Sequence, residues 1–259
     1  MTGDRHCEIR PFPKSRRLVT DGCEWGRKKH IIHTLTECDV TRARAVMREH
    51  RARTGEGLSF TAFIAACIGR AVAENRLCHA YRKGRHLVFF DDVDIGTLVE
   101  HDMEGEKLAT FHVIRSTDKK TFRQIHDEIR ASQKESVESA PGASKWKFFV
   151  RLPYLFRRLF YLWMDHNPEV RKRLGGTVAL TAIGMAGAGT GWGLPIVNNT
   201  LTVTLGGIEI KPGCVDGRID AREYLCMTVS VDHDIVDGAP AARFTTRLRQ
   251  LVEEAAILA

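Results

Sequence analysis

Hydrophobic and polar residues recur along the chain in two patterns, which predict helices and strands in mixed order. Helical spacing predicts helices over residues 40–53, 60–74, 121–132 and 239–256. Apolar, β-rich runs predict strands over residues 31–38, 177–183, 201–210 and 225–231, with two short extended pieces within 87–99. Asp118 is the predicted N-cap of the third helix. Because helices do not regularly separate the strands, we expect a mixed α/β class rather than a purely parallel sheet.

Composition places the chain among globular proteins. Its 259 residues, 43% of them hydrophobic, can build one large domain with a substantial core. Seven cysteines without a CxxC pair argue against a disulfide framework or a zinc site, so we expect reduced thiols and no metal. The N-terminus lacks the apolar stretch of a signal peptide, and no run approaches the roughly 20 apolar residues of a membrane span. We therefore expect a soluble, cytoplasmic protein.

The formal net charge of +7 raises the question of an anionic partner. The Lys and Arg residues are dispersed, and the sequence contains no recognised nucleic-acid-binding motif. We therefore expect no nucleic-acid partner, and a basic surface is better explained by an anionic small molecule.

The candidate chemistry follows the strand predicted over residues 225–231. Asp232, His233 and Asp234 come directly after that strand, and Asp237 and Gly238 precede the last helix. A histidine at a strand end can act as a base near neutral pH, and a nearby carboxylate can orient an imidazole or hold a loop. By spacing alone, a structural, hydrogen-bonding histidine is the more common outcome.

The surrounding residues carry a family resemblance. The segment SVDHDIVDGAPAARFTTRLRQLVEE resembles the C-terminal signature, DHRxxDG followed by a helix, of the dihydrolipoamide acyltransferases of 2-oxo acid dehydrogenase complexes. Chloramphenicol acetyltransferases share the broader HxxxDG motif but tend to have a second histidine where this chain has Asp232. Further matches in the family's order are KKHIIHTLTECDVTRARAV, LSFTAFIAACIGRAVAE, VDIGTLVE, FHVIRSTDKKTFRQIHDEI and GGTVALTAIG. One departure is Asp234, which stands where the family has Arg and reverses a charge beside the motif.

The resemblance implies a fold and a reaction. The fold would be that of chloramphenicol acetyltransferase, a mixed β-sheet flanked by helices that assembles as a homotrimer with the active site between subunits. The reaction would use coenzyme A or an acyl-CoA as substrate and transfer the acyl group directly between donor and acceptor, without an acyl-enzyme.

The resemblance also assigns roles to individual residues. His233 would be the general base, and Thr181 stands where the family has a serine whose hydroxyl binds the oxyanion; a β-branched residue that merely suits a strand is an equally good interpretation. Asp237 would hold the histidine-bearing loop through an ion pair, for which Arg27 in EWGRKKH is the predicted partner. Gly238 would permit a tight turn into the helix. The residues that bind coenzyme A are not identifiable from the sequence.

The chain is expected to be a single catalytic domain, residues 1–259, without a lipoyl or peripheral-subunit-binding domain. No covalent lipoyl group is then expected. Two alternatives stay open: a separate lipoyl-bearing protein presents dihydrolipoamide, or the acceptor is unrelated to it.

Residues 133–174 form a predicted insertion, because the family has a short connection there. Apolar side chains recur at helical spacing within residues 146–164, namely Leu155, Phe156, Leu159, Phe160, Leu162 and Trp163. Arg157 and Arg158 lie toward another face, which makes the helix amphipathic, aromatic and basic. Packing against the domain or a trimer interface is the favoured interpretation, followed by a wall of an acyl tunnel; a membrane-surface anchor is not favoured.

Together these observations predict a coenzyme A-dependent acyltransferase that acts on a dihydrolipoamide-like thiol or a hydroxyl acceptor. One alternative is a noncatalytic trimeric scaffold or membrane-associated structural protein of the same fold. Another is an O-acetyltransferase for a small molecule.

Overall fold

A six-stranded mixed sheet forms the centre of the computed structural model, which describes residues 7–14, 16–103, 106–134, 149, 151–183 and 190–258. The strand order is β1-β8-β7-β6-β4-β5, with bounds Ile31–Asp39, Arg218–Asp232, Leu201–Val215, Val178–Ala182, Ile95–Met103 and Glu106–Ile114. The β4–β6 and β6–β7 pairs are parallel, and the other pairs are antiparallel. The predicted mixed α/β class is confirmed. A separate hairpin joins β2 (Tyr81–Lys83) to β3 (His86–Val88).

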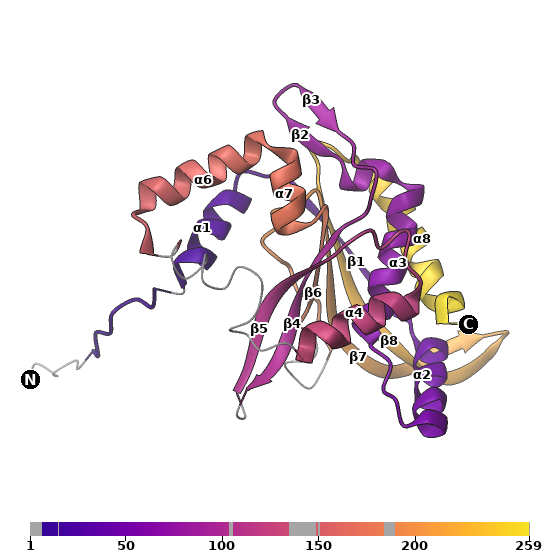
Figure 1. The fold of residues 1–259 in the computed structure, drawn as a ribbon. Helices are drawn as coiled ribbons and strands as arrows, with labels where there is room; N and C mark the ends of the chain where they lie inside the picture. The colour runs from indigo at the N-terminus through magenta and orange to yellow at the C-terminus, as the bar shows by residue number, and fades with distance from the viewer. Residues whose placement is uncertain are drawn as a thin grey trace, which may run out of the picture.

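Helices lie in two groups (Figure 1). One face of the sheet is covered by α3, α4 and α8, with α2 beside α8; their bounds are Phe60–Glu74, Phe122–Lys134, Gly238–Glu254 and Thr41–Thr54. The second group comprises α1, α6 and α7, with bounds Arg16–Gly26, Tyr154–His166 and Pro168–Gly175. Figure 1 shows α1 and α6 as a pair set apart from the sheet. Short 3₁₀ helices span Arg76–His79 and Ala256–Leu258.

The core lies between the sheet and the group of α3 and α8. Side chains alternate between the two faces of a strand, so one face of β7 and β8 supplies the apolar positions Leu201, Val203, Leu205, Met227, Val229 and Val231. The other face carries the polar positions Thr202, Thr204, Thr228 and Ser230, which are also buried. Both faces of β7 and β8 are therefore buried around residues 201–205 and 227–231.

The N-terminus of α4 differs from the prediction. Asp118 was the predicted N-cap, but its Oδ1 accepts the backbone N–H of Val93 at 2.9 Å. Thr121 and Gln124 cap the helix instead, because each side chain accepts the backbone N–H of the other residue. The Thr121 N–H donates to Gln124 Oε1 at 2.9 Å, and the Gln124 N–H donates to Thr121 Oγ1 at 3.3 Å. This is a capping box, which needs only a hydroxyl residue and a Gln three positions later.

Two predicted strands are parts of a longer hairpin. Residues 201–210 and 225–231 lie within β7 and β8, each of which has 15 residues. Asp216 and Gly217 join them with φ values of 50° and 77°, the backbone of a tight hairpin turn, for which Asp-Gly is a favoured pair.

Residues 133–174, the predicted insertion, contain a helix as predicted, α6, and most of a second one, α7; residues 135–148 and 150 lie outside the described part. Within the described residues, no helix is both long and apolar enough to cross a membrane.

Gly69 marks a close contact between α3 and the segment after β5. A Cβ on Gly69 would lie 2.8 to 2.9 Å from Thr117 atoms, two of them backbone. Gly to Ala inside a helix usually stabilises by about 1 kcal/mol, but we expect Gly69→Ala to lower the free energy of unfolding by about 1–3 kcal/mol because of this overlap. Urea denaturation measures the change. Gly175→Ala, at the end of α7 with no atom within 4 Å of its Cβ, is the control and should not destabilise.

Candidate active site

The turn that carries His233 is fixed by backbone hydrogen bonds at both of its ends. The His233 N–H donates to the carbonyl of His30, at 2.7 Å, so the turn is attached to the chain that enters β1. The N–H groups of Ile235 and Val236 both donate to the carbonyl of Asp232 at 3.0 Å. Val236 is fully buried and anchors the turn in the core. The position of the His233 backbone is therefore set by β8, by β1 and by the core.

The imidazole of His233 is open to solvent within one chain. Its side chain is 46% exposed, and its Nδ1 lies 4.0 Å from Oδ1 of Asp237. That distance is too long for a hydrogen bond. The ring nitrogens of His233 can therefore reach an external proton donor.

The structure does not form the expected ion pair between Asp237 and Arg27. Asp237 is 85% exposed, and His233 is the only described residue with which it makes a charged contact within 4.0 Å. Arg27 is exposed at the end of α1. Asp237 is instead the N-cap residue of α8, with an extended backbone and no side-chain cap bond.

Gly238 also differs from expectation. Its φ is not in the left-handed region, and a Cβ there would meet no atom within 4 Å. The turn into α8 therefore does not require glycine within this chain, and the tight-turn reason given for Gly238 is wrong.

Thr181 lies on β6 and is distant from His233 in the same chain. It pairs with Thr204 of β7, which in turn pairs with Thr228 of β8, five positions before His233. A rise of about 3.3 Å per residue and a strand spacing of about 4.8 Å place the backbones of Thr181 and His233 roughly 19 Å apart. Their side chains cannot contact one substrate atom within one protomer.

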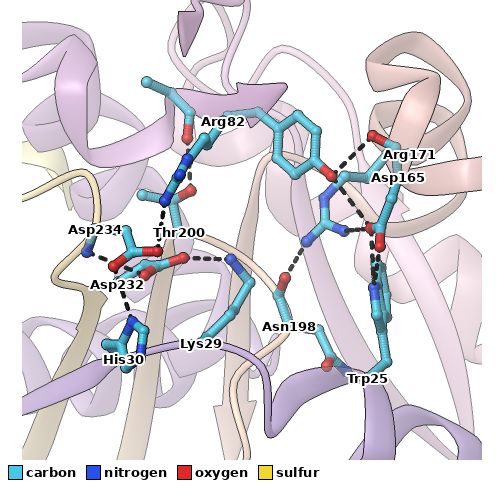
Figure 2. A network of polar contacts seen from close by, with 12 residues as sticks. Trp25, Lys29, His30, Arg82, Asp165, Arg171, Asn198, Thr200, Asp232 and Asp234 are labelled. Atoms are coloured by element: carbon cyan, nitrogen blue, oxygen red, sulfur yellow. Dashed lines mark hydrogen bonds and ion pairs between the residues drawn. The ribbon is translucent and has the colours of Figure 1, made fainter. Parts of the chain in front are cut away.

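A buried ion pair supports the start of the turn. Nζ of Lys29 lies 2.5 Å from Oδ2 of Asp232, and the two side chains are 16% and 5% exposed (Figure 2). Burial lowers the pKa of Lys29, while the bond to Asp232 acts in the opposite direction. Asp232 also accepts the Asp234 N–H at 3.3 Å. The last residue of β8 is thus joined to the lead into β1 by charge as well as by the sheet.

Asp234, the departure from the family signature, has two partners (Figure 2). Its Oδ2 accepts from Arg82 at 2.8 Å, and its Oδ1 lies 2.9 Å from Nδ1 of His30. The bond with His30, and then the charge of Arg82, lower the pKa of the Asp234 carboxyl. Arg82 belongs to the β2–β3 hairpin, so Asp234 attaches that hairpin to the turn.

Arg171 connects the insertion to the same region (Figure 2). Its guanidinium lies between the rings of Trp25 and Tyr81, 4.4 and 4.6 Å from their centroids. It donates to the carbonyl of Asn198 and lies 3.5 Å from the Asp165 carboxylate. Burial lowers the pKa of Arg171, although the ring of Tyr81 and the charge of Asp165 oppose this. The helix α7 is thereby fastened to α1 and to the segment before β7.

Sequence reasoning missed Lys29, Arg82 and Arg171. The charge reversal at Asp234 could have signalled that a cation must lie nearby, but not where. The partners come from segments far away along the chain; Lys29 lies in the KKHIIH segment, but nothing in that segment marks it as the partner of Asp232.

Known proteins resemble this chain over most of its length. The model of the family 2-oxoacid dehydrogenases acyltransferase (catalytic domain) matches residues 165–259. The succinyltransferase component of the 2-oxoglutarate dehydrogenase complex of Bartonella vinsonii subsp. berkhoffii is 24% identical over 230 residues, covering 86% of this chain and 48% of that one. The corresponding Bacillus subtilis protein is 24% identical over 262 residues, covering 97% and 54%. The chain spans about half the length of these relatives.

Solved structures show the fold. The dihydrolipoamide acetyltransferase of Azotobacter vinelandii matches with a TM-score of 0.71 and 19% identity, covering 100% of this chain and 98% of that one. The cubic core of a pyruvate dehydrogenase multienzyme complex matches with a TM-score of 0.70 and 20% identity, covering 100% and 98%. The chain is a distant homologue of the 2-oxoacid dehydrogenase acyltransferase catalytic domains. The expected chloramphenicol acetyltransferase-like fold is confirmed.

One group of side chains in the described part of this acyltransferase homologue has metal-ligand geometry. Ligand atoms of Glu56, His126 and Asp127 lie within 4.8 Å of one another. However, Arg123 donates to both carboxylate oxygens of Glu56 at 2.7 and 2.8 Å, and Nδ1 of His126 accepts the Ser59 N–H at 3.0 Å. Because a guanidinium already neutralises the Glu56 carboxylate, the group is better explained as an ion-pair network between α4 and the segment before α3.

The Lys29–Asp232 pair gives a testable prediction for this acyltransferase homologue. We expect Asp232→Asn to lower the free energy of unfolding by on the order of 3 kcal/mol, because Lys29 is left charged and largely buried. The double variant Asp232→Asn/Lys29→Met should lose less than the sum of the single variants, since it removes both charges. Urea denaturation of all four proteins measures the coupling. If the losses of the two single variants add up to that of the double variant, the predicted coupling between Lys29 and Asp232 is contradicted. Asp127→Asn, which breaks an exposed pair with Arg123, should cost less than about 1 kcal/mol.

Proposed function

We propose that this protein is a coenzyme A-dependent acyltransferase that moves an acyl group between coenzyme A and a dihydrolipoamide-like thiol or a hydroxyl. The positions of three residues along the chain support this activity. A serine, a histidine and an asparagine of the A. vinelandii dihydrolipoamide acetyltransferase have been investigated for their role in its catalytic mechanism. Thr181, His233 and Asp237 stand at the same separations along this chain. The described geometry of His233 suits the role of base.

His233 would act as the general base. The imidazole takes the proton of the acceptor thiol, and the thiolate attacks the carbonyl carbon of the acyl thioester. When the tetrahedral intermediate collapses, the coenzyme A thiolate leaves and takes the proton back from the imidazolium. The exposed ring on a fixed backbone supports this role, because a base must reach the acceptor without moving its own chain.

Thr181 would donate its hydroxyl to the oxyanion of that intermediate. Its pairing with Thr204 of β7 holds its backbone in the sheet, and a preorganised donor is worth about 3 kcal/mol to a transition state. Asp237, four positions after His233, would lie beside the imidazole and help to hold the turn that bears it. The asparagine at the corresponding separation in the A. vinelandii enzyme is uncharged, so a negative charge at this position is not a requirement of the reaction.

The separation between Thr181 and His233 supports a site shared by two copies of the chain. Roughly 19 Å along one sheet cannot be bridged by two side chains. In a ring with closed symmetry, the end of β8 that leads to His233 in one copy can meet the Thr181 region of the next. We therefore propose a homotrimer, and the similarity to a cubic core supports an assembly of this kind. The acceptor thiol would be presented by a separate lipoyl-bearing protein.

Acyl transfer is tested with a panel of acyl-CoAs, short to long chain, and free dihydrolipoamide. Released coenzyme A is separated by chromatography, because the acceptor dithiol reacts with thiol reagents. We expect His233→Ala to lower kcat by about 10²–10⁴-fold, whereas His86→Ala, at the exposed β2–β3 hairpin, should keep parental activity. Absence of turnover by the parent protein, together with no coenzyme A binding in calorimetry, would favour the noncatalytic scaffold instead.

The two interpretations of Thr181 are separated by an isosteric change. We expect Thr181→Val, which keeps the β-branch and loses the hydroxyl, to lower kcat by about 10²–10³-fold, and Thr181→Ser to retain most of it. Unfolding measurements on both variants show whether the strand is preserved. A Thr181→Val protein with parental kcat would mean that the residue serves only the strand.

A mixed assembly tests the shared site. His233→Ala and Thr181→Val chains with different tags are co-expressed and purified by both tags in succession. Each mixed trimer then holds one site in which an intact His233 faces an intact Thr181, so we expect about one third of parental kcat. Each variant alone should remain inactive. If the mixed assembly is as inactive as the single variants, the two residues do not act together across copies.

A further inference from the structure

The helix α6 contacts the rest of the protein through its charged side. Nε of Arg157 donates to Asp21 of α1 at 2.6 Å, and both side chains are buried. Trp25 of α1 contacts Tyr161, with ring centroids 5.4 Å apart, and donates from Nε1 to Asp165 at 2.9 Å. This part of α6 is therefore held in place by an ion pair, a ring contact and a hydrogen bond.

The apolar side of α6 is exposed. Five large side chains at helical spacing form one face, which we call the apolar face of α6: Leu155, Phe156, Leu159, Leu162 and Trp163, between 38% and 62% exposed. Figure 1 shows α6 directed away from the sheet. The favoured expectation of an apolar side packed against the domain is not met within this chain. A continuous exposed apolar face of this kind indicates an interaction surface.

Basic side chains border the apolar face. Lys28 and Arg158 are exposed, and neither forms an ion pair with a described residue. Both line a cavity of about 120 Å³ between α1 and α6, which also includes Leu162 of the apolar face. Residues 146–164 contain four Lys and Arg residues and no acid. Of the acids in the cavity wall, Asp21 pairs with Arg157 and Asp165 with Arg171, while Glu24 accepts the hydroxyl hydrogen of the neutral Tyr154.

We propose that the apolar face of α6, together with Lys28 and Arg158, binds an anionic lipid surface. A helix that carries leucine and aromatic side chains on one side, with cations beside them, suits the boundary between headgroups and acyl chains. The rings and leucines enter the acyl boundary, and the cations meet lipid phosphates. The buried Arg157–Asp21 pair keeps α6 in the orientation that presents this face.

Charge favours a lipid surface over a two-fold contact between copies of the chain as the occupant. A two-fold contact through this face would bring the Arg158 and Lys28 side chains of two copies toward each other. Like charges in such a contact repel, whereas anionic phosphates neutralise them. The lipid surface also matches the linear shape of the face along a single helix.

Vesicle sedimentation tests the proposal with the intact protein. We expect binding to phosphatidylcholine vesicles that contain about one third phosphatidylglycerol, and much weaker binding to phosphatidylcholine alone or at high salt. Leu155→Glu/Leu159→Glu should reduce binding at least about tenfold, and Lys28→Gln/Arg158→Gln should reduce it and its salt dependence. Ile210→Glu/Ile219→Glu, at exposed apolar positions of β7 and β8, adds the same two charges; it is the matched control and should bind like the parent.

Two further measurements separate a loss of vesicle binding from unfolding and from a change in assembly size. Circular dichroism shows whether each variant keeps its helices, and sedimentation velocity without vesicles reports its assembly size. Failure of the parent to bind anionic vesicles, or equal binding by Leu155→Glu/Leu159→Glu, would overturn the proposal. A smaller assembly for that double variant, with no vesicle binding by the parent, would identify the face as a contact between copies.

Discussion

The pairing of β8 between β1 and β7 is the constraint on which the candidate site depends. Side chains alternate along a strand, so a shift of one residue would turn Val229 and Val231 out of the core and separate Asp232 from Lys29. Because both faces of β8 are buried near its end, such a shift is strongly disfavoured. The last pair, Ile31 with Asp232, places the start of the His233 turn beside the start of β1.

The parts that could be predicted from the sequence are local. The spacing of His233 and Asp237, the strands before them and the helix after them depend on residues close together in the chain. The supporting cations could not be predicted, because Lys29 and Arg82 meet their carboxylates from 203 and 152 positions away. Gly238 had a local explanation that failed because the observed turn needs no positive φ there. The fold as a whole followed from a resemblance rather than from periodicity.

The helix α6 shows what periodicity leaves open. The spacing of its apolar residues correctly predicted an amphipathic helix, but it cannot decide which face meets the protein. That choice was made by Asp21, which offers Arg157 a buried partner, and by Trp25, which contacts Tyr161. Arg171, held between Trp25 and Tyr81, then joins the insertion to the strands of the site. The insertion is thus continuous with the framework of the site through α1.

The contact between Asp234 and Arg82 also limits how the sequence of this protein can change. If position 234 alone reverted to the arginine of the family signature, that arginine would face Arg82 and His30, and the β2–β3 hairpin would lose its acidic attachment point. A change at position 82 alone would leave Asp234 with only the histidine. A substitution at either position is therefore better tolerated when the other position changes with it, and the unusual residue after the motif histidine depends on a partner outside the motif.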